Sequence, residues 1–196
     1  LWDFSTLGDS TASPSTDGER IYITNHEGYA YAINKSDGEE VWSTRVTRHP
    51  FMKGIAVGDQ ALYCGSLDGT IHALNPADGE PLWEFKSGSR LETAPAVVKG
   101  KVLFGSQDNH LHALDATTGA ELWKHALKNR LSLAASPRIA GDKVIFGTRS
   151  GIHAHNIETG EEIWAFPTPK HVGTSPVIHN NAVFFGTDNG VFYAIH

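Results

Sequence analysis

The chain has 196 residues, a formal net charge of −6 at pH 7, one Cys and five Trp. A chain of about this length buries roughly 70% of its unfolded surface, which is enough for one domain with a hydrophobic core. The negative charge argues against a general binder of nucleic acid or anionic membranes, and a single Cys excludes a disulfide framework and a Cys-based zinc site. No apolar run reaches the about 18 residues that a membrane span needs.

A repeat of about 40 residues runs through the chain. Three columns carry it, one of Trp, one of Ala and one of Gly, and their members recur every 40 or 41 residues. The columns are Trp2, Trp42, Trp83, Trp123 and Trp164; Ala32, Ala73, Ala113, Ala154 and Ala194; and Gly38, Gly79, Gly119 and Gly160. Unrelated residue types that share one period indicate five copies of a single structural unit.

Each copy contains four short runs typical of β-strands. In the third copy they span residues 94–98, 101–105, 110–114 and 120–124, and they are rich in Val, Leu, Phe and Trp. Turn signals such as Asp108-Asn109 separate the runs, and no stretch keeps a helical period. Four strands in about 40 residues are typical of one blade of a β-propeller, so we predict an all-β fold.

The predicted domain spans 1–196 as five four-stranded blades. The last copy stops at His196 after its third strand, and residues 1–4 match the outer strand that it lacks. We therefore expect this N-terminal strand to close the last blade, which would give a monomer without an open sheet edge. The alternative is that the five blades belong to a larger propeller of seven or eight. The expected blades are 5–44, 45–85, 86–125, 126–166, and 167–196 plus 1–4.

The segment Ala113 to Trp123 (ALDATTGAELW) resembles the tryptophan-docking motif of PQQ-like, quinoprotein-type β-propeller repeats. Residues 32–42, 73–83 and 154–164 repeat it. The resemblance implies that each Trp of the column lies across the Ala and Gly of a motif and packs between neighbouring blades.

That family contains dehydrogenases, which hold pyrroloquinoline quinone and calcium, and non-enzymatic scaffolds of the BamB type. The dehydrogenases typically use a vicinal Cys pair and an aromatic ring under the quinone. This chain has only Cys64, and all five Trp occupy docking positions. We therefore expect a non-enzymatic protein-interaction or ligand-sensing scaffold with no cofactor. A PQQ-dependent dehydrogenase and an accessory or sensor domain of a larger protein are the alternatives. A periplasmic or cell-envelope location follows from the resemblance alone.

Two histidine pairs, His110-x-His112 and His153-x-His155, have a spacing compatible with a metal pair on one face of a strand. His72, His112 and His153 share one repeat column, however, and Tyr fills that column in the first and last copies. A column that accepts either ring indicates a packing position, so the sequence predicts no metal site.

The connections from each Trp strand to the next blade depart from the repeat and are rich in cations. Propeller topology places these loops around one end of the central channel, whereas many Asp and Glu residues lie in the opposite turns. Loops that depart from a scaffold's repeat are candidates for binding. We predict a cationic face that binds a protein partner or a small anionic ligand. Its candidate residues are Arg48, His49, Lys53, Arg90, Lys128, Arg130, Arg138, Lys170 and His171.

Overall fold

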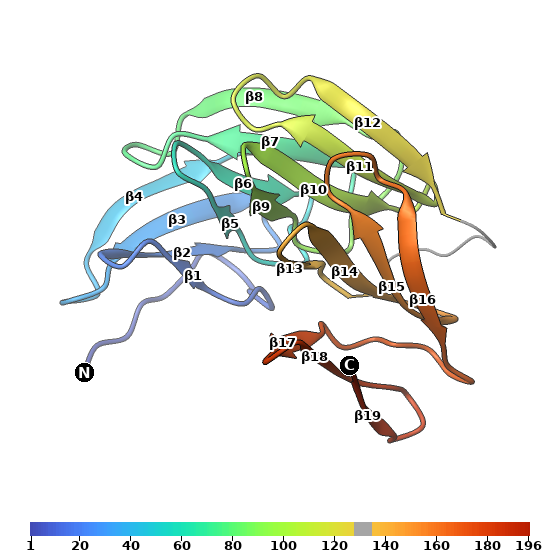
Figure 1. The fold of residues 1–196 in the computed structure, drawn as a ribbon. Coiled ribbons are helices and arrows are strands. Elements are labelled where there is room, and N and C mark those ends of the chain that lie inside the picture. Colours follow the sequence, from blue (N-terminus) through green and yellow to red (C-terminus); the bar gives the residue numbers. More distant parts are fainter. Residues whose placement is uncertain (128–134) are drawn as a thin grey trace.

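In a computed structural model that describes residues 1–127 and 135–196, the chain forms five antiparallel β-sheets that follow one another in sequence order. The sheets fan around a common centre, with the first strand of each innermost (Figure 1). This arrangement confirms the predicted all-β propeller fold. Among the described residues no helix is long and apolar enough to cross a membrane.

The first three sheets have four strands each. The first contains β1 (Ser15–Thr16), β2 (Arg20–Thr24), β3 (Tyr29–Asn34) and β4 (Glu40–Arg45). The second contains β5 (Ala56–Val57), β6 (Leu62–Gly65), β7 (Thr70–Leu74) and β8 (Pro81–Lys86). The third contains β9 (Ala96–Val98), β10 (Lys101–Ser106), β11 (His110–Asp115) and β12 (Glu121–Ala126).

The fourth sheet again has four strands, and the fifth has three. The fourth contains β13 (Arg138–Ala140), β14 (Lys143–Thr148), β15 (Gly151–Asn156) and β16 (Glu162–Pro167). The fifth contains β17 (Val177–His179), β18 (Ala182–Gly186) and β19 (Phe192–Ile195).

Burial within a sheet follows the position of each strand. The middle strands β10 and β11 are buried over most of their length, because a neighbouring sheet covers each face. The outer strand β12 alternates between exposed and half-buried residues, which is the pattern of a strand with one face in solvent. The same contrast separates β14 and β15 from β16.

Each of the first four tryptophans docks onto the turn between the third and fourth strands of a neighbouring blade. Trp42, at the outer strand of the first sheet, lies against Gly79 of the second, and Trp83 lies against Gly119 of the third. Trp2 and Trp123 meet Gly38 and Gly160 in the same way. The indole Nε1 atoms of Trp2, Trp42, Trp83 and Trp123 donate to the carbonyl oxygens of Lys35, Pro76, Ala116 and Ile157 over 3.1, 2.9, 3.1 and 3.3 Å.

Four hydrophobic clusters fill the interfaces between successive sheets. One cluster joins Tyr22 and Trp42 of the first sheet to Leu62 and Cys64 of the second. The other three join the second sheet to the third, the third to the fourth and the fourth to the fifth. Cys64 is fully buried there, and desolvation raises the pKa of its thiol, so this residue is a core residue and not a nucleophile.

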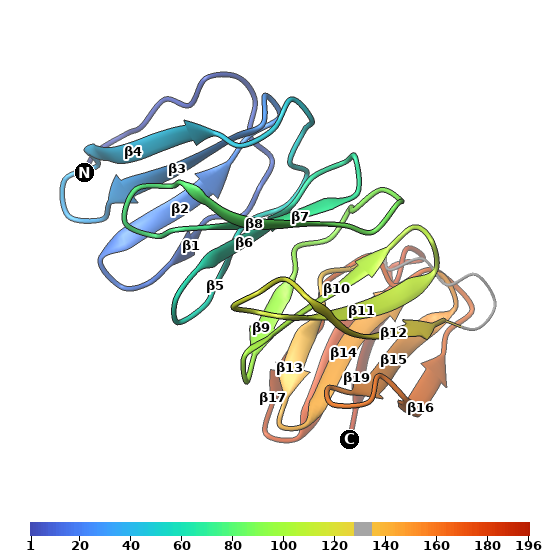
Figure 2. The ribbon, with the colours of Figure 1, turned by 90° about the horizontal axis from the view of Figure 1, so that it is seen from above.

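The predicted closure of the last blade by residues 1–4 is not present in the structure. The fifth sheet has three strands, and residues 1–4 form no strand. The two termini lie apart, the N-terminus beside the first sheet and the C-terminus in the fifth (Figures 1 and 2). The match of residues 1–4 to an outer strand fits the docking of Trp2 on Gly38, because docking needs only the neighbouring turn and not a paired strand.

The docking turn requires glycine for its positive φ and for the space that the indole ring occupies, and substitutions at two glycines can distinguish these two requirements. Gly119 and Gly100 both have a positive φ, of 73° and 70°. A Cβ at Gly119 would lie 2.6 Å from the Trp83 ring, whereas a Cβ at Gly100 meets nothing within 4 Å. We expect Gly100→Ala to lower the free energy of unfolding by about 1–2 kcal/mol through backbone strain, and Gly119→Ala by about 2–5 kcal/mol. Urea denaturation measures both, and equal losses would contradict a steric role for the docking glycine.

Candidate functional site

The inner strands surround a cavity of about 460 Å³ to which all five blades contribute. Its wall consists of residues 13–16, 53–57, 94–96 and 136–139 together with Ser175. These segments include the innermost strands β1 and β5 and the starts of β9 and β13, and each of these four strands forms the edge of its sheet. A ligand bound in this axial cavity can contact several blades at once.

The charge of this axial cavity has one sign. Among the described residues that line it, the charged ones are Lys53 and Arg138, and both are exposed. The remainder of the wall consists of Ser, Thr, Pro, Gly and small aliphatic residues. Two of the predicted cations thus share one cavity, although Lys53 comes from the loop before β5 and Arg138 from β13.

Three further predicted cations, Arg48, Arg90 and Lys170, are exposed on the loops that follow β4, β8 and β16. These loops are fixed to the hairpins of the next blade. Gln107, between β10 and β11, donates its backbone N–H to the Arg90 carbonyl oxygen over 3.0 Å. Leu67 makes the equivalent bond to Pro50 over 3.0 Å. The cationic loops and the hairpin tips therefore lie at the same end of the propeller.

The hairpin tips carry acid, so carboxylates lie among the predicted cations at this end of the propeller. Asp68 lies 3.8 Å from His49, and Asp188 lies 2.9 Å from His171. Asp residues are favoured in hairpin turns, which accounts for these carboxylates in the sequence. The sequence pattern predicts the acidic residues in the turns at the opposite end. His49 and His171 are thus engaged within the protein. Lys128 and Arg130 lie outside the described residues.

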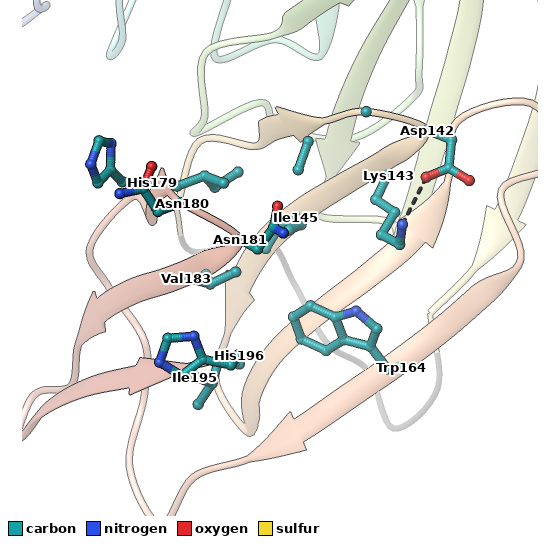
Figure 3. Close-up of a pocket in the computed structure, with 13 residues that line it drawn as sticks. Asp142, Lys143, Ile145, Trp164, His179, Asn180, Asn181, Val183, Ile195 and His196 are labelled. Atoms are coloured by element: carbon teal, nitrogen blue, oxygen red, sulfur yellow. Dashed lines mark hydrogen bonds and ion pairs between the residues drawn. The ribbon is translucent and has the colours of Figure 1, made fainter.

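Trp164 has a different environment from the other docking tryptophans. It lines an open cavity of about 740 Å³ between the fourth and fifth sheets, together with Val183, Ile195 and an Asp142–Lys143 ion pair of 2.8 Å (Figure 3). The other docking tryptophans meet a glycine turn at the equivalent place. This cavity belongs to the interface between blades.

The histidine column forms a repeated hydrogen-bonded motif with glutamate. The Nδ1 atoms of His72, His112 and His153 lie 3.2, 2.9 and 3.1 Å from carboxylate oxygens of Glu84, Glu121 and Glu162. His112 and His153 also stack on Phe104 and Phe146. The structure therefore supports a packing role for the column, but the glutamate partners were not visible in the repeat, because Glu84 occupies a different column from Glu121 and Glu162.

The fourth blade adds a second buried histidine, His155, beside His153. Its Nδ1 donates to the carbonyl oxygen of Gly160 over 2.8 Å, and its Nε2 lies 3.9 Å from Glu162 Oε2. Burial lowers the pKa of His155 below its ordinary value of 6.5, so the ring is neutral at pH 7.

This lowered pKa of His155 predicts the pH dependence of stability. Below pH 6.5 the unfolded chain binds a proton at this ring before the folded chain does, so the contribution to stability is present at pH 7 and is lost as pH falls toward the folded pKa. In His155→Leu, which introduces the residue of the second and third blades, we expect the unfolding free energy to fall less between pH 7 and pH 5. Urea denaturation across this range in a chelating buffer tests it, and an unchanged slope would contradict it.

Comparison with known proteins relates this geometry to one family. A family model described as the outer membrane protein assembly factor BamB matches residues 1–54 and 27–196. The solved structure of BamB from Moraxella catarrhalis has a TM-score of 0.82 at 18% identity, over 95% of this chain and 58% of that one. A europium-containing methanol dehydrogenase has a TM-score of 0.83 at 17% identity, over 99% of this chain and 50% of that one.

A tetrathionate hydrolase from Acidithiobacillus ferrooxidans is 39% identical over 46 residues, which is 24% of this chain and 9% of the hydrolase. The chain thus spans less than two thirds of each of these three relatives. The two structural likenesses, with identities of 18% and 17%, show the fold alone. The family model, in contrast, extends over the five sheets, and the chain belongs to the family of the outer membrane protein assembly factor BamB.

Proposed function

We propose that the chain is a non-enzymatic scaffold of the cell envelope that binds an acidic segment of a partner protein at the axial cavity. The observation that carries the proposal is the charge of the cavity wall. All five blades contribute to the wall, and the charged residues among its described members, Lys53 and Arg138, are both cations. The family's description as an outer membrane protein assembly factor supports an envelope location and a protein partner.

An extended peptide fits this wall in two ways. The innermost strands β1, β5, β9 and β13 are two or three residues long, and each leaves one edge unpaired toward the centre. Unpaired backbone groups at a sheet edge can hydrogen-bond to an extended segment. Arg138 can bind a carboxylate through two parallel hydrogen bonds, and Lys53 adds a second positive charge. The exposed cations Arg48, Arg90 and Lys170 raise the local concentration of an anionic partner.

The same wall does not fit the cofactor of the quinoprotein dehydrogenases. Calcium takes six to eight oxygen ligands, with carboxylates prominent among them, and a quinone needs a flat ring to stack on. The described residues that line the cavity include no carboxylate and no aromatic ring. The alternative of a quinone-dependent dehydrogenase therefore has no site in the axial cavity.

Charge reversal at the cavity tests the proposal. The probe is a fluorescent decapeptide of alternating Glu and Ser, and fluorescence anisotropy measures its affinity at low salt. We expect Lys53→Glu/Arg138→Glu to weaken binding about tenfold or more, because two attractive charges become repulsive. The control Lys86→Glu/Lys99→Glu makes the same change in net charge at two exposed positions outside the cavity, and it should retain most of the affinity.

Equal losses in the two double variants would show that net charge alone drives binding and would contradict a role for the cavity. Glutarate at millimolar concentration serves as a competitor. We expect glutarate to displace the peptide only at concentrations far above the dissociation constant of the peptide. If glutarate bound as tightly as the peptide, the ligand of the cavity would be a small anion and not a segment of a partner protein.

Dye-linked oxidation of alcohols provides an independent check on the enzymatic alternative. With pyrroloquinoline quinone and calcium added in excess, we expect no dye reduction above the level without protein, because the cavity wall offers no ligand set for either. Turnover that saturates with the quinone would contradict the non-enzymatic proposal.

A further inference from the structure

We propose that His153, His155 and Glu162 form a binding site for a divalent transition metal of the zinc class in the fourth blade. The inference is independent of the proposed function, since these residues lie within one sheet and not at the axial cavity.

Strand geometry brings the three side chains together. His153 and His155 are two residues apart on β15, so they point to the same face of the sheet. A register shift between Ala154 and His155 places His155 opposite Glu162, the first residue of β16. One ligand atom of each residue then lies within 4.8 Å of the other two.

The distances within this group suit a metal with nitrogen and oxygen ligands. Glu162 Oε2 lies 3.1 Å from His153 Nδ1, in a hydrogen bond that the metal would replace once the ring proton moves to Nε2, and 3.9 Å from His155 Nε2. Zinc bonds of about 2.1 Å in a tetrahedral arrangement separate neighbouring ligand atoms by about 3.4 Å, between the two observed values. The ring of His125 from the third blade lies 5.4 Å from that of His155, centroid to centroid, so a fourth ligand can come from this ring or from water.

The hydrogen bonding of His155 supplies an observation that does not depend on the clustering. Its Nδ1 must carry the proton, since the Gly160 carbonyl oxygen can only accept. The Nε2 atom therefore presents a lone pair, and it is buried without a hydrogen-bond partner in a residue that is 2% exposed. This lone pair lies 3.9 Å from a Glu162 carboxylate oxygen, and a cation held between the two gives the Nε2 atom the partner that it lacks. A backbone carbonyl on the other ring nitrogen is the usual support of a metal-binding histidine.

The fourth blade departs from the repeat at this position. The residues equivalent to His155 are Ile33, Leu74, Leu114 and Ile195 in the other blades. The second and third blades have leucine in place of His155, and there Ser66 or Asp108 faces the Nε2 atom of the column histidine. Among the described residues, the three-ligand group therefore occurs in the fourth blade alone.

The ligand set also indicates the class of metal. Two neutral imidazoles and one carboxylate favour zinc, cobalt or nickel over calcium and magnesium, which prefer oxygen ligands throughout. His153 and His155 are buried, whereas the Glu162 side chain is 27% exposed and offers a route for the ion from solvent.

The test uses the whole chain, stripped with a chelator and titrated with Co²⁺, whose visible absorption reports tetrahedral nitrogen and oxygen ligation. We expect one equivalent to bind, with displacement by Zn²⁺ and not by Ca²⁺. Substitution His155→Leu introduces the aliphatic residue of the second and third blades, so the fold should be retained. We expect it to weaken binding about 100-fold or more, since loss of a mere supporting partner already costs 10–100-fold.

The matched control is His112→Tyr, which removes the equivalent column histidine of the third blade and introduces the residue of the first and last blades. It should bind Co²⁺ as the unmodified chain does. Glu162→Gln, which keeps the side-chain shape, should lose affinity like His155→Leu. Thermal unfolding gives a second readout, with Zn²⁺ raising the Tm of the unmodified chain and of the control but not of His155→Leu. The absence of binding, or binding that survives His155→Leu, would overturn the proposal.

Discussion

The contact between a tryptophan of one blade and a glycine turn of the next is the constraint on which the rest of the structure depends. The indole ring occupies the volume that any side chain at the turn would need, and its N–H satisfies a carbonyl oxygen of the same turn. Each hydrophobic cluster likewise joins only two successive sheets. Stability in such an arrangement is a sum over neighbouring blades, as in other repeat proteins. The blades hold one another in position without a single central core.

The innermost strands contribute less to packing than the other strands do, and their residues are therefore available for binding. Packing is carried mainly by the middle strands and by the docking turns, whereas β1, β5, β9 and β13 are short, and their side chains are at most partly buried against the clusters. Residues that line the axis can therefore vary in charge without loss of the fold. Lys53 and Arg138 are the charged residues among the described part of the inner wall, and both are cations.

The strands and the order of the blades could be predicted from the sequence, because the repeat determines them. Contacts between loops of different repeats could not be predicted. The columns of Trp, Ala and Gly were sufficient for the strands and for the blade order. They could not show that Asp68 and Asp188 would pair with His49 and His171, because residues that share no column meet only after the loops fold back onto the next blade. Nor could the match of residues 1–4 to an outer strand show whether that segment would pair with the last sheet.

The fourth blade shows how a departure from a repeat points to function. A buried position that holds Ile or Leu in the other blades has no packing need for a histidine. The ring leaves Nε2 without a partner, and an unsatisfied buried polar atom costs about 1–3 kcal/mol. An aliphatic side chain would avoid that cost in the same space. The fourth blade therefore bears this cost as long as no ligand is bound. In the proposed site a cation bound by His155 Nε2 and Glu162 removes the cost.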